Sequence, residues 1–200
     1  MSWHYAPGQY FQRDGVEAND NAMEVYYFFS GLSVPWATES IAALAGNMNI
    51  ESTMNPLVRL FTTSGAFGLV QWITHKQTMS TWCANNGYDR DTGTGQCAYI
   101  EAERGGADDQ WSRKSEWNNI SFTQFAQNTP GYTVEQLAKC FNDCFEKPGS
   151  YNPQRARWAV YYYQMFTGSP PGPTPGNIDK WLLFKFRKEV KTRVHRSFFV

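Results

Sequence analysis

One glutamate stands where a helical pattern gives way to a turn, and its surroundings favour acid catalysis. Glu51 follows an apolar run that ends at Ile50, and the chain then turns at Asn55-Pro56. A carboxyl group beside packed apolar side chains loses hydration, which raises its pKa. A carboxylic acid with a raised pKa can protonate the leaving oxygen of a glycosidic bond. The residues alone also allow an ordinary solvated glutamate near a helix end.

A glycine-rich segment downstream offers groups that suit a sugar. Gly65 and Gly68 lack side chains, so the backbone there could approach a ligand closely, although both glycines would equally suit a hairpin. Gln71 carries a hydrogen-bond donor and an acceptor, which suits hydroxyl and acetamido groups. Three aromatic side chains are candidates for stacking on sugar rings: Phe67, Trp72 and Tyr163. Burial in the core would explain these rings equally well.

The cysteines and histidines do not form a clear metal-binding pattern. The chain has four cysteines, Cys83, Cys97, Cys140 and Cys144, and three histidines. Cys140 and Cys144 have a spacing that two metal ligands could use, but no histidine lies at a matching short offset. We expect buried free thiols or one disulfide, such as Cys83 to Cys97, and neither a metal nor another cofactor.

The apolar residues follow helical spacing over most of the chain, which predicts a mainly helical fold. The predicted helices cover residues 19–30, 36–50, 76–84, 94–104, 122–127, 134–146 and 153–166. Asp20 and Thr133 are the predicted N-caps of the first and sixth of these helices. Residues 65–72 are instead typical of a tight turn or a short hairpin strand.

Length and composition limit the classes of protein. The 200 residues carry 18 basic and 18 acidic side chains, and this zero net charge argues against a whole-chain nucleic-acid-binding protein. No stretch approaches the ~18 consecutive apolar residues of a membrane span. The N-terminus does not have the pattern of a secretory signal peptide.

The charges divide the chain into a domain and a tail. The sequence predicts one domain over residues 1–168 and a Pro/Gly-rich linker over 169–177. Residues 178–200 have seven basic and two acidic side chains, a net charge of +5, which leaves −5 for the rest. About 23 residues are too few for an independent domain, so this basic, aromatic tail is expected to be a docking arm, a surface-binding peptide or the start of a truncated second domain.

Two motifs together resemble the phage-tail lysozyme family of the lysozyme-like superfamily. The first is Glu-Ser-x-x-Asn-Pro over residues 51–56, and the second is Ser-x-Ala-x-Gly-Leu-x-Gln over residues 64–71. Supporting matches follow in the same order: Gln96, Tyr99, Ile100, Glu103, Phe141, Phe145-Glu146-Lys147-Pro148, Arg155, Ala159, Tyr161 and Tyr163. The resemblance extends over about residues 19–168.

The resemblance implies a mainly α, lysozyme-like α+β fold of two helical lobes, with a small β-hairpin element beside the catalytic groove. It implies that Glu51 is the general acid of a muramidase, which cleaves the β-1,4 bond between N-acetylmuramic acid and N-acetylglucosamine in peptidoglycan. The residues expected to bind the substrate are Ser52, Gly65, Phe67, Gly68, Gln71, Trp72 and Tyr163.

The second carboxylate is less clearly indicated. Glu146 is the leading candidate because it stands in a matched motif before a helix-breaking proline, although an ion pair with Arg155 that only holds two helices together would also explain it. Glu103 has the position of a structural ion pair, and Asp108 and Asp109 fit no motif. An enzyme with one acid would be a lytic transglycosylase, in which the muramic acid 6-hydroxyl attacks and an anhydro product forms.

The expected partners are bacterial peptidoglycan and phage tail proteins, with no nucleic acid and no membrane span. The expected location is the tail of a virion that acts on the host cell wall. An endolysin held in the host cytoplasm before release is the alternative. A hypothesis of a different class is a wall-binding or tail-assembly module that keeps the groove without turnover.

Overall fold

The computed structural model describes residues 2–59, 65–106, 110–147 and 150–169. Within these ranges the helices are α1 (Val16–Ser30), α2 (Thr38–Ser52), α3 (Lys76–Asn85), α4 (Gly93–Arg104), α5 (Phe122–Ala126), α6 (Val134–Phe141) and α7 (Gln154–Phe166), with a 3-10 turn, Ser115–Trp117, and a π-helical turn, Asn142–Glu146. The prediction of a mainly helical fold is confirmed. Asp108, Asp109, the tail over 178–200 and the predicted linker beyond Ser169 lie outside the described residues.

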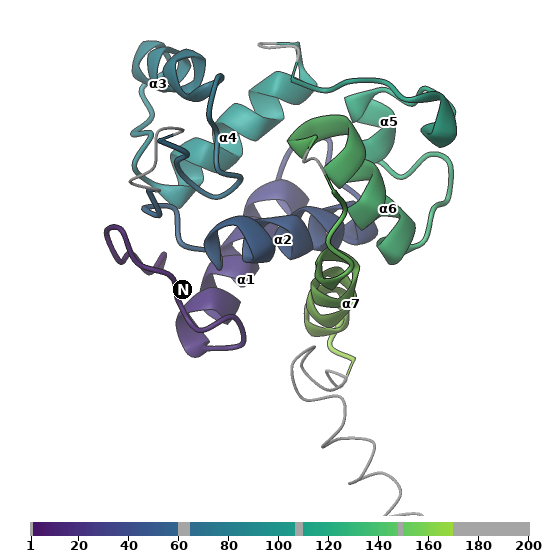
Figure 1. Ribbon diagram of the computed structural model, residues 1–200, viewed down its shortest axis with the longest axis horizontal. Coiled ribbons are helices and arrows are strands. Elements are labelled where there is room, and N and C mark those ends of the chain that lie inside the picture. The colour runs from purple at the N-terminus through teal and green to yellow at the C-terminus, as the bar shows by residue number, and fades with distance from the viewer. Residues whose placement is uncertain (1, 60–64, 107–109, 148–149, 170–200) are drawn as a thin grey trace, which may run out of the picture.

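The helices form two groups around a central helix (Figure 1). α3 and α4 lie on one side and α5 and α6 on the other, while α1, α6 and α7 pack against α2. α2 can take this central place because its side chains from Ser40 to Asn49 are mostly small or apolar and all of them are buried. A helix that is covered on most sides by other elements is stabilised by burial rather than by one amphipathic face.

Gly46 brings α2 and α7 into direct backbone contact. A Cβ atom at Gly46 would lie 2.5 Å from the backbone nitrogen of Ala159 and 2.5 Å from the carbonyl oxygen of Arg155, closer than any side chain permits. The two helices run antiparallel, since Arg155 contacts the end of α2 and Tyr163 contacts Glu39 at its beginning. This packing fixes the first turn of α7 beside the last turns of α2.

Two helix ends differ from the prediction. α1 begins at Val16 after Gly15, and Asp20 lies inside the helix, where its carboxylate meets the His4 ring nitrogen at 3.0 Å. Asp20 as the N-cap was therefore wrong, because the helix extends further upstream. The sixth predicted helix gives way after Phe141 to the π-helical turn, whereas Thr133 caps α6 in a capping box, as predicted.

The segment before α3 holds no regular strand among its described residues. Two isolated antiparallel bridges, Arg59 to Phe67 and Phe67 to Trp72, close a tight loop. Gly68 and Gln71 both have positive φ angles, +83° and +52°, which the reversal of the chain requires. A tight turn is thus present, but the expected β-hairpin element is not confirmed.

All four cysteines are buried free thiols, so the disulfide from Cys83 to Cys97 is not formed. Burial raises the pKa of the Cys83 thiol to about 11 and raises that of Cys97 further. The described residues contain no cluster of three or more side chains that could hold a metal ion. They also contain no helix with the length and apolar character needed to cross a membrane.

Candidate active site

Glu51 lies in the last turn of α2, and the residues that follow it fix that end of the helix. The Ser52 hydroxyl donates to the carbonyl oxygens of Met48, at 3.0 Å, and Leu69, at 2.9 Å. The helix then ends at Thr53 in the left-handed conformation, with a φ of 51°. Ser52 is fully buried, so its observed role is to join α2 to the loop at Leu69. This bond brings the glycine-rich loop beside Glu51.

Arg155, from the first turn of α7, forms an ion pair with the Glu51 carboxylate. The same guanidinium donates to Asn47 Oδ1 at 3.0 Å, and Asn47 is held in turn by the carbonyl oxygens of Ala43 and Ala138. The Arg155 side chain is only 5 % exposed, against 22 % for Glu51. A buried cation needs a counter-charge, and Glu51 supplies it. The alternative in which Arg155 bonds Glu146 is not what the structure shows.

Glu146 reaches the same region through the π-helical turn. This turn ends at Lys147, whose left-handed backbone donates a hydrogen bond to the Asn142 carbonyl at 2.8 Å. One carboxyl oxygen of Glu146, Oε1, is buried without a hydrogen-bond partner among the described residues. π-helical turns are rare and occur often at functional sites. Here Glu146 is the last residue of such a turn.

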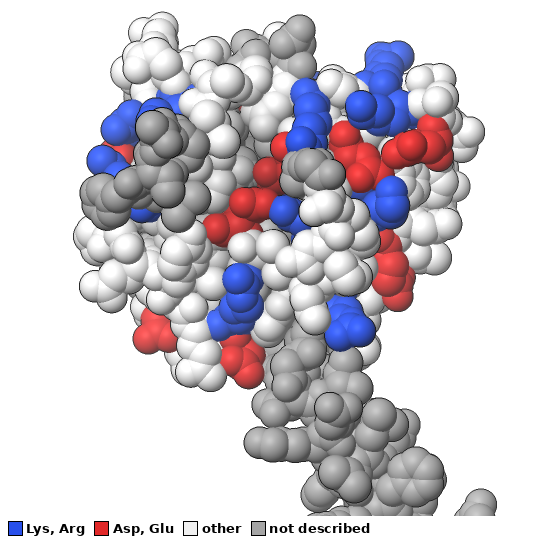
Figure 2. Space-filling model, viewed as in Figure 1, with Lys and Arg blue, Asp and Glu red and all other residues white. Residues whose placement is uncertain are grey.

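Charge and burial act together on Glu146. Burial raises the pKa of its carboxyl group well above the usual value, and the nearby Glu51 carboxylate raises it further. Arg155 lowers this pKa, and Glu103, buried in the last turn of α4, raises it. Three carboxyl groups and one guanidinium thus influence one another. Figure 2 shows acidic side chains gathered near the centre of one face, beside basic ones.

Gly68 makes room for a side chain of the protein itself. A Cβ atom there would lie 2.7 Å from Gln96 Oε1. Gln96 Oε1 accepts a hydrogen bond from the Leu69 amide at 2.8 Å, and Gln96 Nε2 donates to the carbonyl oxygens of Pro56 and Arg90, both at 2.9 Å. These hydrogen bonds of Gln96 hold the loop on α4, and the Gln96 side chain occupies the space beside Gly68. No ligand is needed to explain this glycine.

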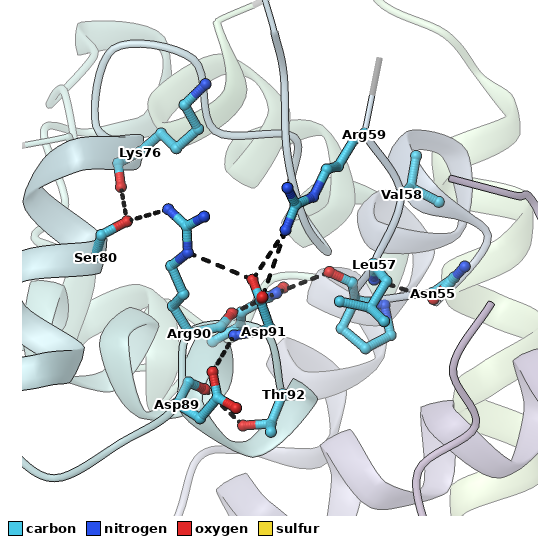
Figure 3. A network of polar contacts seen from close by, with 12 residues as sticks. Asn55, Leu57, Val58, Arg59, Lys76, Ser80, Asp89, Arg90, Asp91 and Thr92 are labelled. Atoms are coloured by element: carbon cyan, nitrogen blue, oxygen red, sulfur yellow. Dashed lines mark hydrogen bonds and ion pairs between the residues drawn. The ribbon is translucent and has the colours of Figure 1, made fainter. Parts of the chain in front are cut away.

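Phe67 is almost fully buried, at 2 % exposed, beneath two guanidinium groups. Arg59 and Arg90 lie 5.0 and 5.4 Å from the centre of its ring. Asp91 joins the two arginines through contacts of 3.3 and 3.4 Å, as Figure 3 shows. Gly65 at the start of the loop accepts a hydrogen bond from Lys76 Nζ at 2.9 Å. These contacts stiffen the loop between its bridge and α3.

A hollow of about 270 Å³ adjoins Glu146. It is lined by residues 70–75, Gln110 and residues 145–147, and so contains the expected Gln71 and Trp72. Four buried polar atoms of the lining residues have no hydrogen-bond partner among the described residues: Gln71 Oε1, Trp72 Nε1, Gln110 Oε1 and Glu146 Oε1. Such atoms are few in native proteins, so the lining of this hollow is unusually polar for a region with little solvent contact.

Tyr163 lies away from this region. Its hydroxyl donates to Glu39 Oε1, at 3.3 Å, at the beginning of α2. Glu39 and Glu51 are twelve residues apart on one helix, or about 18 Å at the rise of an α-helix. The structure therefore brings Glu51, Glu146, Gln71 and Trp72 into one region and does not bring Tyr163 there.

Tyr10 also lies near Glu51, although the sequence did not indicate it as a candidate site residue. Tyr10 is 49 % exposed and lies within the electrostatic reach of Glu51. Burial of part of the side chain raises the pKa of its phenol, and the Glu51 carboxylate raises it further. The N-terminal segment has no regular periodicity, so nothing in its local pattern indicated that it would lie against the end of α2.

Comparison with known proteins identifies the family. The family model described as phage tail lysozyme matches residues 20–166. The chain is also 32 % identical over 138 residues to morphogenesis protein 1 of Bacillus phage B103. The aligned region covers 66 % of this chain and 36 % of that protein. The chain thus spans only about a third of the relative's length. With most of its described fold inside the matched region, the chain belongs to the phage tail lysozyme family.

Proposed function

We propose that this domain is a muramidase, which hydrolyses the β-1,4 bond between N-acetylmuramic acid and N-acetylglucosamine in peptidoglycan. The observation that carries the proposal is the pair of carboxyl groups, Glu51 and Glu146, that lie close enough to influence one another beside one buried guanidinium. Membership of a lysozyme-like family supports glycan cleavage of this type. Glycoside hydrolysis needs such a pair of carboxyl groups.

In this mechanism Glu51 protonates the leaving glycosidic oxygen, and Glu146 is the second carboxyl group, which activates the water or stabilises the positive charge on the sugar. Because the two groups interact, their protonation is a property of the pair rather than of either residue. Arg155 balances one negative charge, so the pair and the guanidinium are neutral when one proton is bound. The raised pKa of Glu146 places this proton on Glu146 before the reaction, while Glu51 is paired with Arg155, so the mechanism requires the proton to pass to Glu51 before Glu51 donates it to the leaving oxygen.

Arg155 acts as a positioning residue. Its guanidinium is fixed by Asn47 and by the close contact of α2 with α7, and it holds the Glu51 carboxylate in one orientation. A fixed acid requires little reorganisation when the substrate reacts, which favours catalysis.

We further propose that the enzyme acts on the host cell wall from the tail of a virion. The name of the relative from Bacillus phage B103 refers to morphogenesis, and the matched family is named for the phage tail. A component of a tail reaches the wall from outside the cell. Peptidoglycan and other tail proteins are the partners that this location requires.

The test is mass spectrometry of the soluble fragments released from purified peptidoglycan by the wild-type chain, Glu51→Gln and Glu146→Gln. Reducing-end muramic acid products from the wild type, and their loss in both variants, are expected. Anhydro-muramic products from the wild type would instead identify the reaction as transglycosylation and not as hydrolysis. Wall binding by a folded wild-type chain without any fragments would favour the non-catalytic module.

A further inference from the structure

The N-terminal segment is fastened to the same motif that carries Glu51. Asn55 Nδ2 donates to the Gln9 carbonyl oxygen at 2.7 Å, and the Phe11 amide donates to Thr53 Oγ1 at 2.7 Å. These two bonds hold the residues on either side of Tyr10. Thr53 and Asn55 follow Glu51 by two and four residues in the sequence. The position of Tyr10 relative to the carboxylate is therefore fixed by the backbone on both sides.

A third contact continues this fastening along α2. The Arg13 guanidinium donates to the Asn49 carbonyl oxygen and lies 3.2 Å from Asn49 Oδ1. Asn49 Nδ2 donates in return to the Arg13 carbonyl oxygen at 2.9 Å. The segment thus lies along the last turn of α2 and the residues that follow it, and Glu51 lies within that turn.

The Tyr10 side chain is not used by this fastening. Among the described residues its side chain makes no hydrogen bond or ring contact, and 49 % of the residue is exposed, whereas the neighbouring Phe11 packs against the core. An exposed aromatic ring on a fixed backbone is preorganised for binding, since little further order is lost when a ligand arrives. Tyrosine offers both an apolar ring face and a hydroxyl group to such a ligand.

We infer that Tyr10 forms one wall of the substrate groove and stacks its ring against a pyranose ring of the glycan strand next to the bond that is cleaved. This inference rests on the proposed function and assigns a substrate-binding residue to the same site. The electrostatic influence of Glu51 on the phenol agrees with a location beside the reacting bond. Tyr10 takes no part in the cleavage of the bond. It holds the sugar ring in position relative to Glu51.

The test compares Tyr10→Ala, Tyr10→Phe and Tyr27→Ala with the wild-type chain. Tyr27 is the matched control because it is also a tyrosine that is 49 % exposed, and it lies on α1. KM and kcat are measured on soluble, uncrosslinked glycan strands, and the unfolding temperature is measured for each variant. We expect Tyr10→Ala to raise KM about fivefold with little change in kcat, because an aromatic contact of this kind contributes such a factor.

Tyr10→Phe keeps the ring and should restore most of the wild-type KM, while Tyr27→Ala should leave KM unchanged. An unchanged KM in Tyr10→Ala would overturn the inference. An equal loss of kcat in Tyr10→Ala and Tyr10→Phe, with a lowered unfolding temperature, would also overturn it in favour of a structural role.

Direct binding to the strands separates this inference from the proposed function. If the wild-type chain binds the strands without cleaving them, the muramidase proposal fails and the affinity of each variant replaces KM in the comparison. If the wild-type chain neither binds nor cleaves, both proposals are wrong.

Discussion

Glu146→Gln should change how the stability of the protein depends on pH. The wild-type carboxyl group has a raised pKa because it is buried next to Glu51, whereas the unfolded chain has an ordinary glutamate pKa of about 4.3. Between these two pKa values the folded state binds one more proton than the unfolded state. The free energy of unfolding therefore falls as the pH rises through this window, by about 1.4 kcal/mol per pH unit.

Glutamine is neutral and nearly the same size, so it removes this dependence. Below pH ~4 the variant and the wild type should have similar stability, since both states of the wild type are then protonated. Above that pH the variant should become progressively more stable than the wild type, until the pH passes the raised pKa of Glu146. The gain arises because the wild type must take up a proton on Glu146 when it folds in this pH range, whereas glutamine is neutral in both states.

The assay is urea denaturation at several pH values from 4 to 8, with Glu116→Gln as the control for removal of one exposed carboxylate. The quantity of interest is the difference in unfolding free energy between each variant and the wild type. A difference for Glu146→Gln that stays constant across this range would refute the assignment of a raised pKa. Cleavage of peptidoglycan should be lost in the same variant, so a more stable protein would be an inactive one.

Three other substitutions follow from the geometry of the site. Glu51→Gln should lower the rate of wall cleavage by about 10²–10⁴ while the circular dichroism spectrum stays unchanged, since the amide cannot donate the catalytic proton; activity near wild type would exclude Glu51 as the acid. Gly46→Ala should cost about 1–3 kcal/mol in urea denaturation, because the added methyl group meets the backbone of α7 at 2.5 Å. Asn55→Ala should expose the N-terminal segment to limited proteolysis before the rest of the domain, because two of the hydrogen bonds that fasten it are lost; cleavage at the wild-type rate would contradict this role.

Local signals predicted the helices well where the determining contacts are close in sequence. Thr133 was identified as an N-cap because its partner, Gln136, lies three residues away. Asp20 was assigned wrongly because α1 continues upstream to Gly15, and the carboxylate of Asp20 meets His4 instead. The π-helical turn that ends at Glu146 has no local signature in the sequence.

The contacts of the site depend on residues that lie far apart in the chain. Glu51 and Arg155 were each picked out by motif, but their pairing joins positions 104 residues apart and had to be seen in the structure. Gly68 was interpreted as room for a ligand, whereas the space is taken by Gln96. A single sequence shows which residue types are present, and the packing of α7 on α2 decides which of them meet.

The direct contact at Gly46 also determines which parts of the domain can move. Because α2 and α7 touch through their backbones, Glu51 and Arg155 belong to one rigid body. The loop over residues 65–72 is held on α4 by Gln96 and is joined to α2 by the Ser52 hydroxyl. A shift of this loop relative to α2 would therefore have to break the hydrogen bond from Ser52 to Leu69, whereas Glu51 and Arg155 would keep their relative orientation.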